Sequence, residues 1–403
     1  MSEGFQAVRN TQKRGEPYPV KRFGLENAGK VRRFHASFPG YQATPLVNLE
    51  GLARELGLGG VCVKDESRRF GLNAFKVLGG SYAMGSYIAR RLGMRIEELS
   101  YEAMTGEEVR RRLGEVTFVT ATDGNHGRGV AWTANRLGQK AVVYMPKGSA
   151  PERLRNIQAL GAEASITDLN YDDAVRLARE NAARYGWVLV QDTAWEGYED
   201  IPGWIMEGYT TMALEAAEQM QAGGFRPTHI FLQAGVGSMA GAVAGFFADL
   251  YGKGERPVIT VVEPNQADCL FRTAQAGDGR LHFVSGRMDT IMAGLACGEP
   301  CTLGWEVLRD HADHFVSCPD YVAAQGMRIL SSPLPGDERV ISGESGAATL
   351  GLVAEVMRNE KLAWLRRQLC LDKDSRVLCI STEGATDREN YQKIVWDGLY
   401  PGI

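Results

Sequence analysis

The chain has 403 residues, more than a single hydrophobic core usually supports, so two domains are the default expectation. Its 45 basic and 49 acidic residues nearly cancel and no basic tract is present, which argues against a nucleic-acid-binding surface. With 44% hydrophobic residues and 48 glycines, the composition is that of a globular α/β protein and not of a disordered one. We therefore expect a small-molecule partner.

The cysteines and the apolar runs predict the compartment. The seven cysteines are scattered, with no CxxC pair and no Cys/His spacing typical of zinc, so we expect no bound metal. Residues 1–15 are polar and contain no apolar signal core. The longest nearly apolar run, residues 239–248, is about half as long as a membrane span. These features predict a soluble cytoplasmic protein with no membrane partner.

The first informative segment along the chain is residues 73–80. It places Lys76 between the apolar side chains of Phe75 and Val77 and before a glycine pair. A lysine in partly dry surroundings has a lowered pKa and becomes nucleophilic, and glycines let a flat ligand approach the backbone closely. Lys76 is therefore a candidate Schiff-base lysine, while a solvated surface lysine is the reading that the residue alone would favour.

A glycine-bearing loop, residues 120–129, follows a strand-like stretch at 116–119 and precedes a helical pattern at 130–137. This order places unpaired backbone N–H groups at a helix N-terminus, where an anion can bind. A tight turn between strand and helix explains the same pattern without a ligand. His126 in this loop could be a ligand or a base, but we expect it to make a structural hydrogen bond.

Strand-like and helical patterns then alternate, which predicts parallel βα units. The expected strands are residues 140–145, 164–167, 187–191, 229–232, 258–262 and 377–381, and the expected helices are residues 150–160 and 174–182. Gly161 and Gly186 mark the ends of these two helices.

A second glycine loop, residues 233–241, opens an Ala/Gly-rich helix with Ser238 near its N-terminus. This arrangement is typical of a phosphate-binding loop. Gly235, Gly237 and Gly241 also nearly match a dinucleotide fingerprint, but Glu263 is the one acid near the place where that fingerprint needs it. A dinucleotide site therefore stays open as an alternative.

Seven segments, in chain order, resemble the fold-type-II pyridoxal-phosphate enzymes of the tryptophan synthase β family, and within that family the diaminopropionate ammonia-lyases. These segments are residues 64–67, 70–76, 122–132, 144–150, 191–198, 291–300 and 341–347. The resemblance covers nearly the whole chain. It implies two doubly wound open-sheet α/β domains, a smaller one (residues 81–204) inserted in a larger one (residues 1–80 and 205–403), with pyridoxal 5'-phosphate in the cleft between them.

The resemblance also implies roles for the matching positions. Lys76 would hold the cofactor as a Schiff base and act on the α-proton, and Asn125 would bond the phenolic oxygen of its ring. The second glycine loop would take the phosphate, and a hydroxyl, of Ser381 or of Thr382, would face the pyridine nitrogen. The expected cofactor-binding residues are Phe75, Lys76, Asn125, Gly235, Val236, Gly237, Ser238, Met239, Ser381 and Thr382.

Two acids set this chain apart from the general dehydratase pattern. Asp123 stands where related dehydratases carry Ser or Thr, in the loop expected to receive the substrate carboxylate, and a substrate with a second amine would explain it. Asp192 ends a predicted strand, where a helix N-cap is its other interpretation. The resemblance implies that these acids handle a D isomer while Lys76 serves the L isomer. The expected substrate-binding residues are Thr122, Asp123, Gly124, His126 and Asp192.

The expected reaction is therefore elimination from D- or L-2,3-diaminopropionate to pyruvate and two ammonia molecules, by a homodimer with Lys76, Asp123 and Asp192 as catalytic residues. A serine or threonine dehydratase on the same scaffold is the nearest alternative, and a non-catalytic cofactor-binding protein is an alternative of another class. The charged residues 64–69 could be an ordinary solvated edge, although the resemblance places them next to the lysine segment. We expect Cys269 and Cys297 to be two separate buried thiols and not a redox-sensitive pair.

Overall fold

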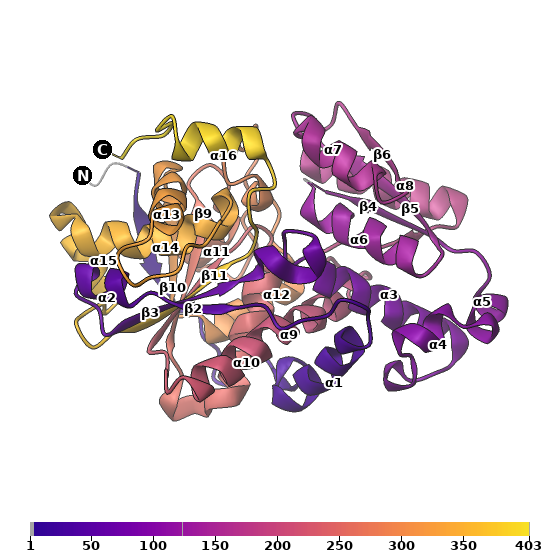
Figure 1. Ribbon diagram of the computed structural model, residues 1–403, viewed down its shortest axis with the longest axis horizontal. Helices are drawn as coiled ribbons and strands as arrows, with labels where there is room; N and C mark the ends of the chain where they lie inside the picture. The colour runs from indigo at the N-terminus through magenta and orange to yellow at the C-terminus, as the bar shows by residue number, and fades with distance from the viewer. Residues whose placement is uncertain (1–3, 123, 403) are drawn as a thin grey trace.

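The protein folds around two sheets that lie side by side, each covered by helices (Figure 1). The computed structural model describes residues 4–122 and 124–402. The larger sheet has seven strands in the order β1-β10-β9-β8-β11-β3-β2, and the smaller one has four in the order β6-β5-β4-β7. Both sheets with their helices form the expected α/β architecture.

The larger sheet is parallel inside and antiparallel at both edges. Its strands are β1 (Gln6–Arg9), β2 (Leu46–Asn48), β3 (Gly60–Asp65), β8 (His229–Gln233), β9 (Val258–Pro264), β10 (His314–Cys318) and β11 (Arg376–Ser381). The five inner strands run parallel, whereas β1 and β2 pair antiparallel with their neighbours. The expectation of parallel strands is thus confirmed for the strands that the sequence predicts, whereas β1 and β2, which it does not predict, add short antiparallel edges.

Successive residues of the inner strands face two separate hydrophobic cores. On β3, Val61 and Val63 belong to one core, and Cys62 to the other. On β11, Val377 and Leu378 divide in the same way. Helices therefore cover both faces. They are α1 (Leu25–Ala36), α2 (Glu50–Leu56), α9 (Asp200–Ala222), α10 (Ser238–Glu255), α11 (Cys269–Ala276), α12 (Thr302–His311), α13 (Tyr321–Ser331), α14 (Glu344–Arg358), α15 (Ala363–Gln368) and α16 (Arg388–Val395).

The smaller sheet is wholly parallel, as the alternation of patterns predicts. Its strands are β4 (Thr117–Ala121), β5 (Lys140–Met145), β6 (Glu163–Ile166) and β7 (Val188–Leu189). Its helices are α6 (Asn125–Arg136), α7 (Pro151–Gln158) and α8 (Tyr171–Tyr185), and α3 (Val77–Leu92), α4 (Tyr101–Thr105) and α5 (Glu107–Leu113) precede it along the chain. The predicted strands and helices of this region are confirmed to within a few residues.

Strand β7 is shorter than the predicted strand at 187–191, and a side chain explains the difference. The last backbone hydrogen bond to β4 comes from the N–H of Val190, which donates to the carbonyl of Val119 at 2.8 Å, and the side-chain amide of Gln191 then pairs with β4 in place of the main chain. Its Oε1 accepts from the backbone N–H of Ala121 at 3.0 Å, and its Nε2 donates to the Ala121 carbonyl at 3.1 Å. The main chain is thereby released at Asp192, which turns toward the space between the sheets.

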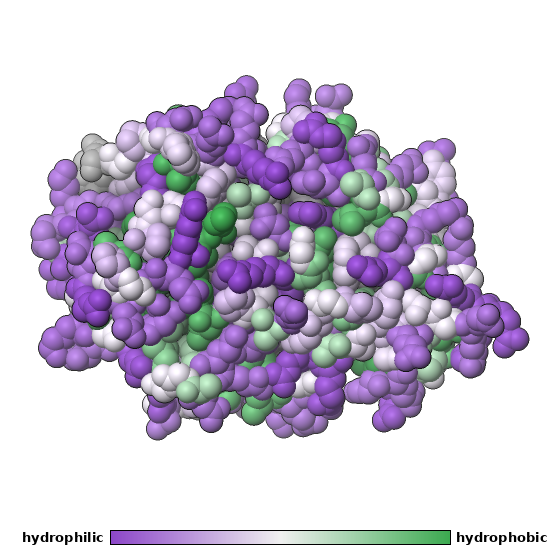
Figure 2. Space-filling view, viewed as in Figure 1, coloured by the Kyte–Doolittle hydropathy of each residue, from purple (hydrophilic) through white to green (hydrophobic). Residues whose placement is uncertain are grey.

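Helices α3 and α9 carry the chain between the two sheets and pack against each other. The predicted domain boundaries, residues 80/81 and 204/205, fall inside these helices, and the division into two domains stays a prediction. The face in Figure 2 is mainly hydrophilic, with hydrophobic side chains confined to small areas. Within residues 4–122 and 124–402, no helix has the length and apolar character that a membrane crossing requires.

Candidate active site

A cavity of about 780 Å³ lies beyond the carboxyl ends of strands from both sheets. Residues that follow β4, β5, β8 and β11 line it, among them Asn125, Pro146, Ala234 and Thr382. In open α/β sheets, ligands bind beyond the carboxyl ends of the strands because helix N-termini and loops converge there. The geometry therefore points to this cavity as the functional site.

Lys76 lies at the cavity wall, at the start of α3. Its Nζ is 2.8 Å from Oδ2 of Asp192, and the other oxygen of that carboxylate, Oδ1, accepts a hydrogen bond from the hydroxyl of Tyr171 at 3.2 Å. Burial alone would raise the pKa of Asp192, but the positive charge and hydrogen bond of Lys76 hold it below its usual range. The cavity thus contains a lysine amine and an ionised carboxylate in direct contact.

The loop before α10 offers a set of unused backbone donors. Within the described part of the chain, none of the backbone N–H groups of residues 235 to 240 donates a hydrogen bond. Gly237, the N-cap, has a left-handed φ of 96°, which turns the chain into the helix, and the first helical turn carries no acidic residue. Free N–H groups at a helix N-terminus bind phosphate, so this loop fits the phosphate of pyridoxal phosphate.

The glycines of this loop are explained by close packing as well as by the ligand. A Cβ on Gly235 would lie 3.1 Å from Sγ of Cys297, and one on Gly241 would lie 3.1 Å from Cα of Gly304. Glu263 does not face the cavity: its carboxylate accepts from the backbone N–H groups of Leu270 and Phe271, at the start of α11. The dinucleotide alternative therefore lacks its acid.

Other residues that line the cavity provide groups for a flat ring. The rings of Phe75 and Tyr209 lie 4.7 Å apart, centroid to centroid, and Asn125 begins α6. Oγ1 of Thr382 accepts from Nε2 of Gln233 at 3.1 Å, which leaves the hydrogen of this hydroxyl for a ligand. Both the ring wall and the hydroxyl fit a pyridine ring.

The other candidate hydroxyl, that of Ser381, lies behind the cavity wall. It donates to Oγ of Ser342 at 2.7 Å, and its residue is fully buried and does not line the cavity. Of the two hydroxyls left open by the sequence, the one that reaches the cavity belongs to Thr382.

The structure brings most of the expected site residues together. The expected residues that line the cavity are Phe75, Lys76, Asn125, Asp192, Gly235, Val236, Gly237, Ser238, Met239 and Thr382. Asp123 lies outside the described residues. Thr122, Gly124 and His126 do not line the cavity.

The hydrogen bonds of those last three residues indicate how they shape the loop. Oγ1 of Thr122 accepts from the backbone N–H groups of Gly124 at 2.9 Å and Gly127 at 3.1 Å. Nε2 of His126 lies 2.8 Å from the carbonyl oxygen of Val190, which is the structural hydrogen bond expected for it. Their part in substrate binding stays a prediction.

Two glutamates line the cavity that were not among the expected site residues: Glu344 at the start of α14 and Glu383 after β11. Burial raises the pKa of Glu344 to about 7, and the charge of Glu383 adds to this rise. No motif spacing links the two positions. The adjacency of Glu383 to Thr382 is the one signal in the sequence that could have drawn attention to it.

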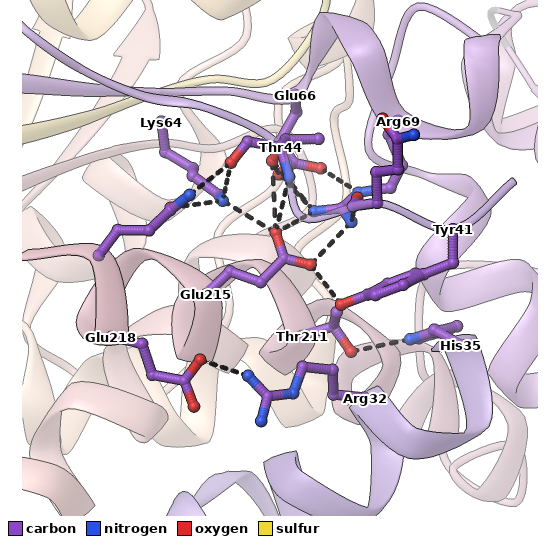
Figure 3. Close-up of polar contacts among 12 residues, drawn as sticks. Arg32, His35, Tyr41, Thr44, Lys64, Glu66, Arg69, Thr211, Glu215 and Glu218 are labelled. Atoms are coloured by element: carbon purple, nitrogen blue, oxygen red, sulfur yellow. Dashed lines mark hydrogen bonds and ion pairs between the residues drawn. The ribbon is translucent and has the colours of Figure 1, made fainter. Parts of the chain in front are cut away.

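The charged residues 64–69 are not a solvated edge: Lys64, Glu66 and Arg69 are fully buried, and only Arg68 of the charged side chains beside them is mostly exposed. Glu215 of α9 accepts from Nζ of Lys64 at 2.8 Å and from Nη2 of Arg69 at 2.7 Å (Figure 3). This network anchors the turn that leads directly to the Lys76 segment.

Cys269 and Cys297 are both buried, and no disulfide joins them in the described part of the chain. That the two thiols act separately stays a prediction. Within the described residues, no group of His, Cys, Asp and Glu side chains could hold a metal ion.

A family model described as "Pyridoxal-phosphate dependent enzyme" matches residues 38–382. The chain is 52% identical to the diaminopropionate ammonia-lyase of Escherichia coli K12, over 96% of this chain and 95% of that protein. It is 55% identical to the enzyme of that name from Salmonella typhimurium, over 92% of each.

A solved structure extends the comparison to three dimensions. The Escherichia coli diaminopropionate ammonia-lyase in complex with an aminoacrylate-PLP azomethine reaction intermediate superposes with a TM-score of 0.90 at 49% identity, covering 98% of both chains. The likeness confirms the fold class and the cofactor expected from the sequence. The chain therefore belongs to the family of pyridoxal-phosphate-dependent enzymes, and to the lyases among them.

Proposed function

We propose that this enzyme converts 2,3-diaminopropionate and water to pyruvate and two ammonia molecules. The observation that carries the proposal is the contact between Lys76 and Asp192 inside the cavity, because it joins a nucleophilic amine to a carboxylate suited to a cationic substrate. The relatives with more than half of their residues identical carry the name diaminopropionate ammonia-lyase, which supports the same substrate.

The residues of the cavity would hold the cofactor at four points. The free N–H groups of residues 235 to 240 would bind its phosphate, and Phe75 and Tyr209 would confine its ring. Asn125 would donate to the phenolic oxygen, and the Thr382 hydroxyl would donate to the pyridine nitrogen. The cofactor supplies an electron sink for the α-carbon. A neutral hydroxyl stabilises a full charge on the ring less than a carboxylate does, which favours elimination over transamination.

Lys76 and Asp192 would divide the proton transfers. For the L isomer, the amine of Lys76 takes the α-proton, the bond from the β-carbon to nitrogen breaks, and the leaving nitrogen keeps the electron pair and acquires a proton. Asp192 stays ionised beside Lys76 and can face the second amino group of the substrate. For the D isomer, whose α-proton points to the other face, we propose Asp123 and Asp192 as the proton acceptors.

The proposed function is tested on the purified holoenzyme. D- and L-2,3-diaminopropionate are supplied separately, with L-serine and L-threonine as controls, and pyruvate and ammonia are measured. Two ammonia molecules per pyruvate from both isomers, faster than any keto acid from the hydroxy amino acids, are expected. Turnover restricted to serine or threonine would instead establish a dehydratase, and no turnover of any of the four would favour a non-catalytic cofactor-binding protein.

The isomer assignment has its own test. Asp123→Asn is expected to reduce kcat/KM for the D isomer by about 10²-fold or more and for the L isomer by much less, because only the D isomer needs that acid as a base. Lys76→Ala is the comparison variant: it removes the Schiff-base lysine as well as the base of the L isomer, so both isomers are expected to lose turnover. Equal losses of both isomers in Asp123→Asn would contradict the assignment.

We also propose that the enzyme is a cytoplasmic homodimer and that residues 81–204 form the inserted smaller domain. The resemblance to dimeric family members supports the first statement, and the separate four-stranded sheet supports the second. Sedimentation of the purified enzyme at a mass of about two chains of 44.1 kDa each is the expected result.

A further inference from the structure

Glu383 is buried at the cavity wall, and both oxygens of its carboxylate accept hydrogen bonds. It is 2% exposed, its Oε2 accepts from Nδ2 of Asn125 and, at 3.5 Å, from the hydroxyl of Thr386, and its Oε1 accepts from the backbone N–H of Ser345 at 3.2 Å. Ser345 belongs to the first turn of α14, whose N-terminus favours a negative charge. The carboxylate is thus fixed at one end by a helix N-terminus and meets Asn125 at the other.

The backbone around Glu383 is tied to the lysine segment. The N–H of Phe75 donates to the carbonyl of Thr382 at 3.1 Å, the N–H of Gly384 donates to the carbonyl of Asn73 at 3.0 Å, and Ala74 and Glu383 form an antiparallel bridge. Lys76 comes directly after this short pairing. The backbone pairing therefore fixes the position of Glu383 relative to Lys76.

A carboxylate accepts hydrogen bonds but does not donate them, so it discriminates between the two ends of an amide. The amide of an asparagine rotates over a broad range about its last bond, and its hydrogen-bond partners decide which end points where. In contact with Glu383, Asn125 must present its NH₂ group on that side. One N–H of that group is used by Glu383 and the second remains.

We propose that Glu383 is a positioning residue that fixes the amide of Asn125, so that its remaining N–H serves the phenolic oxygen of the cofactor ring. Glu383 acts through Asn125 and takes no part in proton transfer. The inference depends on cofactor binding, and it holds whichever amino acid is the substrate.

The test is a double-mutant cycle on cofactor binding. Wild type, Asn125→Ala, Glu383→Ala and the double variant are compared by the dissociation constant of pyridoxal phosphate in equilibrium dialysis and by the visible absorbance of the bound cofactor. Each single variant is expected to raise the dissociation constant about tenfold and to shift the absorbance in the same way. The double variant is expected to match Asn125→Ala.

Two outcomes would overturn the proposal. If Glu383→Ala leaves both the absorbance and the dissociation constant unchanged, the carboxylate does not position the amide. If the increases in the dissociation constant caused by the two substitutions multiply in the double variant, Glu383 acts independently of Asn125. Neither readout uses diaminopropionate, so a failure of this proposal is distinguishable from a failure of the proposed function.

Two further variants separate positioning from a loss of packing. Glu383→Gln keeps an acceptor oxygen in a side chain of nearly the same shape, so it is expected to restore most of the wild-type absorbance, and it carries the same cycle should Glu383→Ala not fold. A Glu383→Gln protein as impaired as Glu383→Ala would count against the hydrogen bond. Glu355→Ala removes another buried glutamate of the same region, on α14 and bonded to Asn359, and is expected to leave the absorbance unchanged.

Discussion

Two clusters of acids and bases, one around Lys64 and one around Lys76, differ in how completely their side chains are shielded from solvent. In the buried network, Lys64 and Glu215 are 2.8 Å apart and both are at most 1% exposed. In the cavity, Lys76 and Asp192 are also 2.8 Å apart, but the lysine is 16% exposed. A lysine–carboxylate pair of the same length is thus fully buried in the network around Lys64 and accessible to a ligand in the cavity.

The hydrogen-bond partners of Lys64 explain why the buried network is unreactive. Nζ of Lys64 donates to the carbonyl of Thr44 at 2.6 Å, to Glu215 and to Oε1 of Gln219 at 2.9 Å, which uses all three hydrogens of its ammonium group. Arg69 bridges Glu215 and Glu66 in the same network (Figure 3). A buried network that satisfies every member is rigid, whereas an incompletely enclosed pair can exchange its partner for a substrate.

The largest expected effect separates the two lysines. Lys76→Ala is expected to abolish the visible Schiff-base absorbance and to lower turnover by at least about 10⁴-fold, because it removes the amine that would form the Schiff base and take the α-proton. Lys64→Met is the matched control, since it removes a buried lysine that contacts a carboxylate, that of Glu215, at the same distance; it is expected to destabilise the fold but to keep the absorbance. Unchanged turnover of Lys76→Ala would remove this lysine from the mechanism.

Glu215→Ala breaks the sealed cluster. It leaves Lys64 and Arg69 buried with one fewer carboxylate, and breaking a buried ion pair in this way costs about 3–5 kcal/mol of unfolding free energy. The measurement is denaturant unfolding of the apoprotein. Glu218 lies three residues after Glu215 on α9, where it is half exposed and pairs with Arg32. Glu218→Ala is therefore expected to cost less than about 1 kcal/mol of unfolding free energy. Similar losses in the two variants would show that the network is not sealed.

Glu344, which also lines the cavity, predicts a pH-dependent stability. The pKa of its carboxyl is about 7 in the folded state and 4.5 ordinarily, so its contribution to stability is fully present below pH 4.5, where the group is neutral in both states. As the pH rises from 4.5 to 7, the unfolded chain releases its proton first, and about 3 kcal/mol of unfolding free energy is lost.

Glu344→Gln isolates this contribution, because the amide does not titrate. The difference in unfolding free energy between wild type and Glu344→Gln is expected to fall across pH 4.5 to 7 and to be constant above it. Carboxylates that do not interact with Glu344 cancel in that difference. A difference that does not change with pH would show that Glu344 is not desolvated at the cavity wall.

The smallest effect distinguishes the two hydroxyls beside β11. Thr382→Val is expected to weaken cofactor binding by about tenfold, the contribution of one hydrogen bond, because its hydroxyl reaches the cavity. Ser381→Ala is expected to leave cofactor affinity within about twofold of wild type, since its hydroxyl donates to Ser342. Equilibrium dialysis checks both, and the reverse order of effects would assign the pyridine nitrogen to Ser381.

The sequence predicts those parts of the fold and site that depend on local patterns. Apolar alternation and glycine ends locate β4 to α8 to within a few residues, and the glycine loop before α10 indicates a phosphate site from its own spacing. The short strands β1 and β2 have too few residues to show a pattern, so only their pairing with β10 and β3 reveals them. The chemistry of Lys76 follows from its neighbours and from the order of the loops.

Contacts between distant segments were decided only by the tertiary structure. Asn125 meets Glu383 across 258 residues and Lys76 meets Asp192 across 116, and no local spacing encodes either distance. The burial of Lys64 and Arg69, the choice of Thr382 over Ser381 and the raised pKa of Glu344 arise in the same way. A sequence records which groups can bond or titrate, but dehydration and partners depend on what the rest of the chain packs around them, and these two factors decide which groups remain reactive.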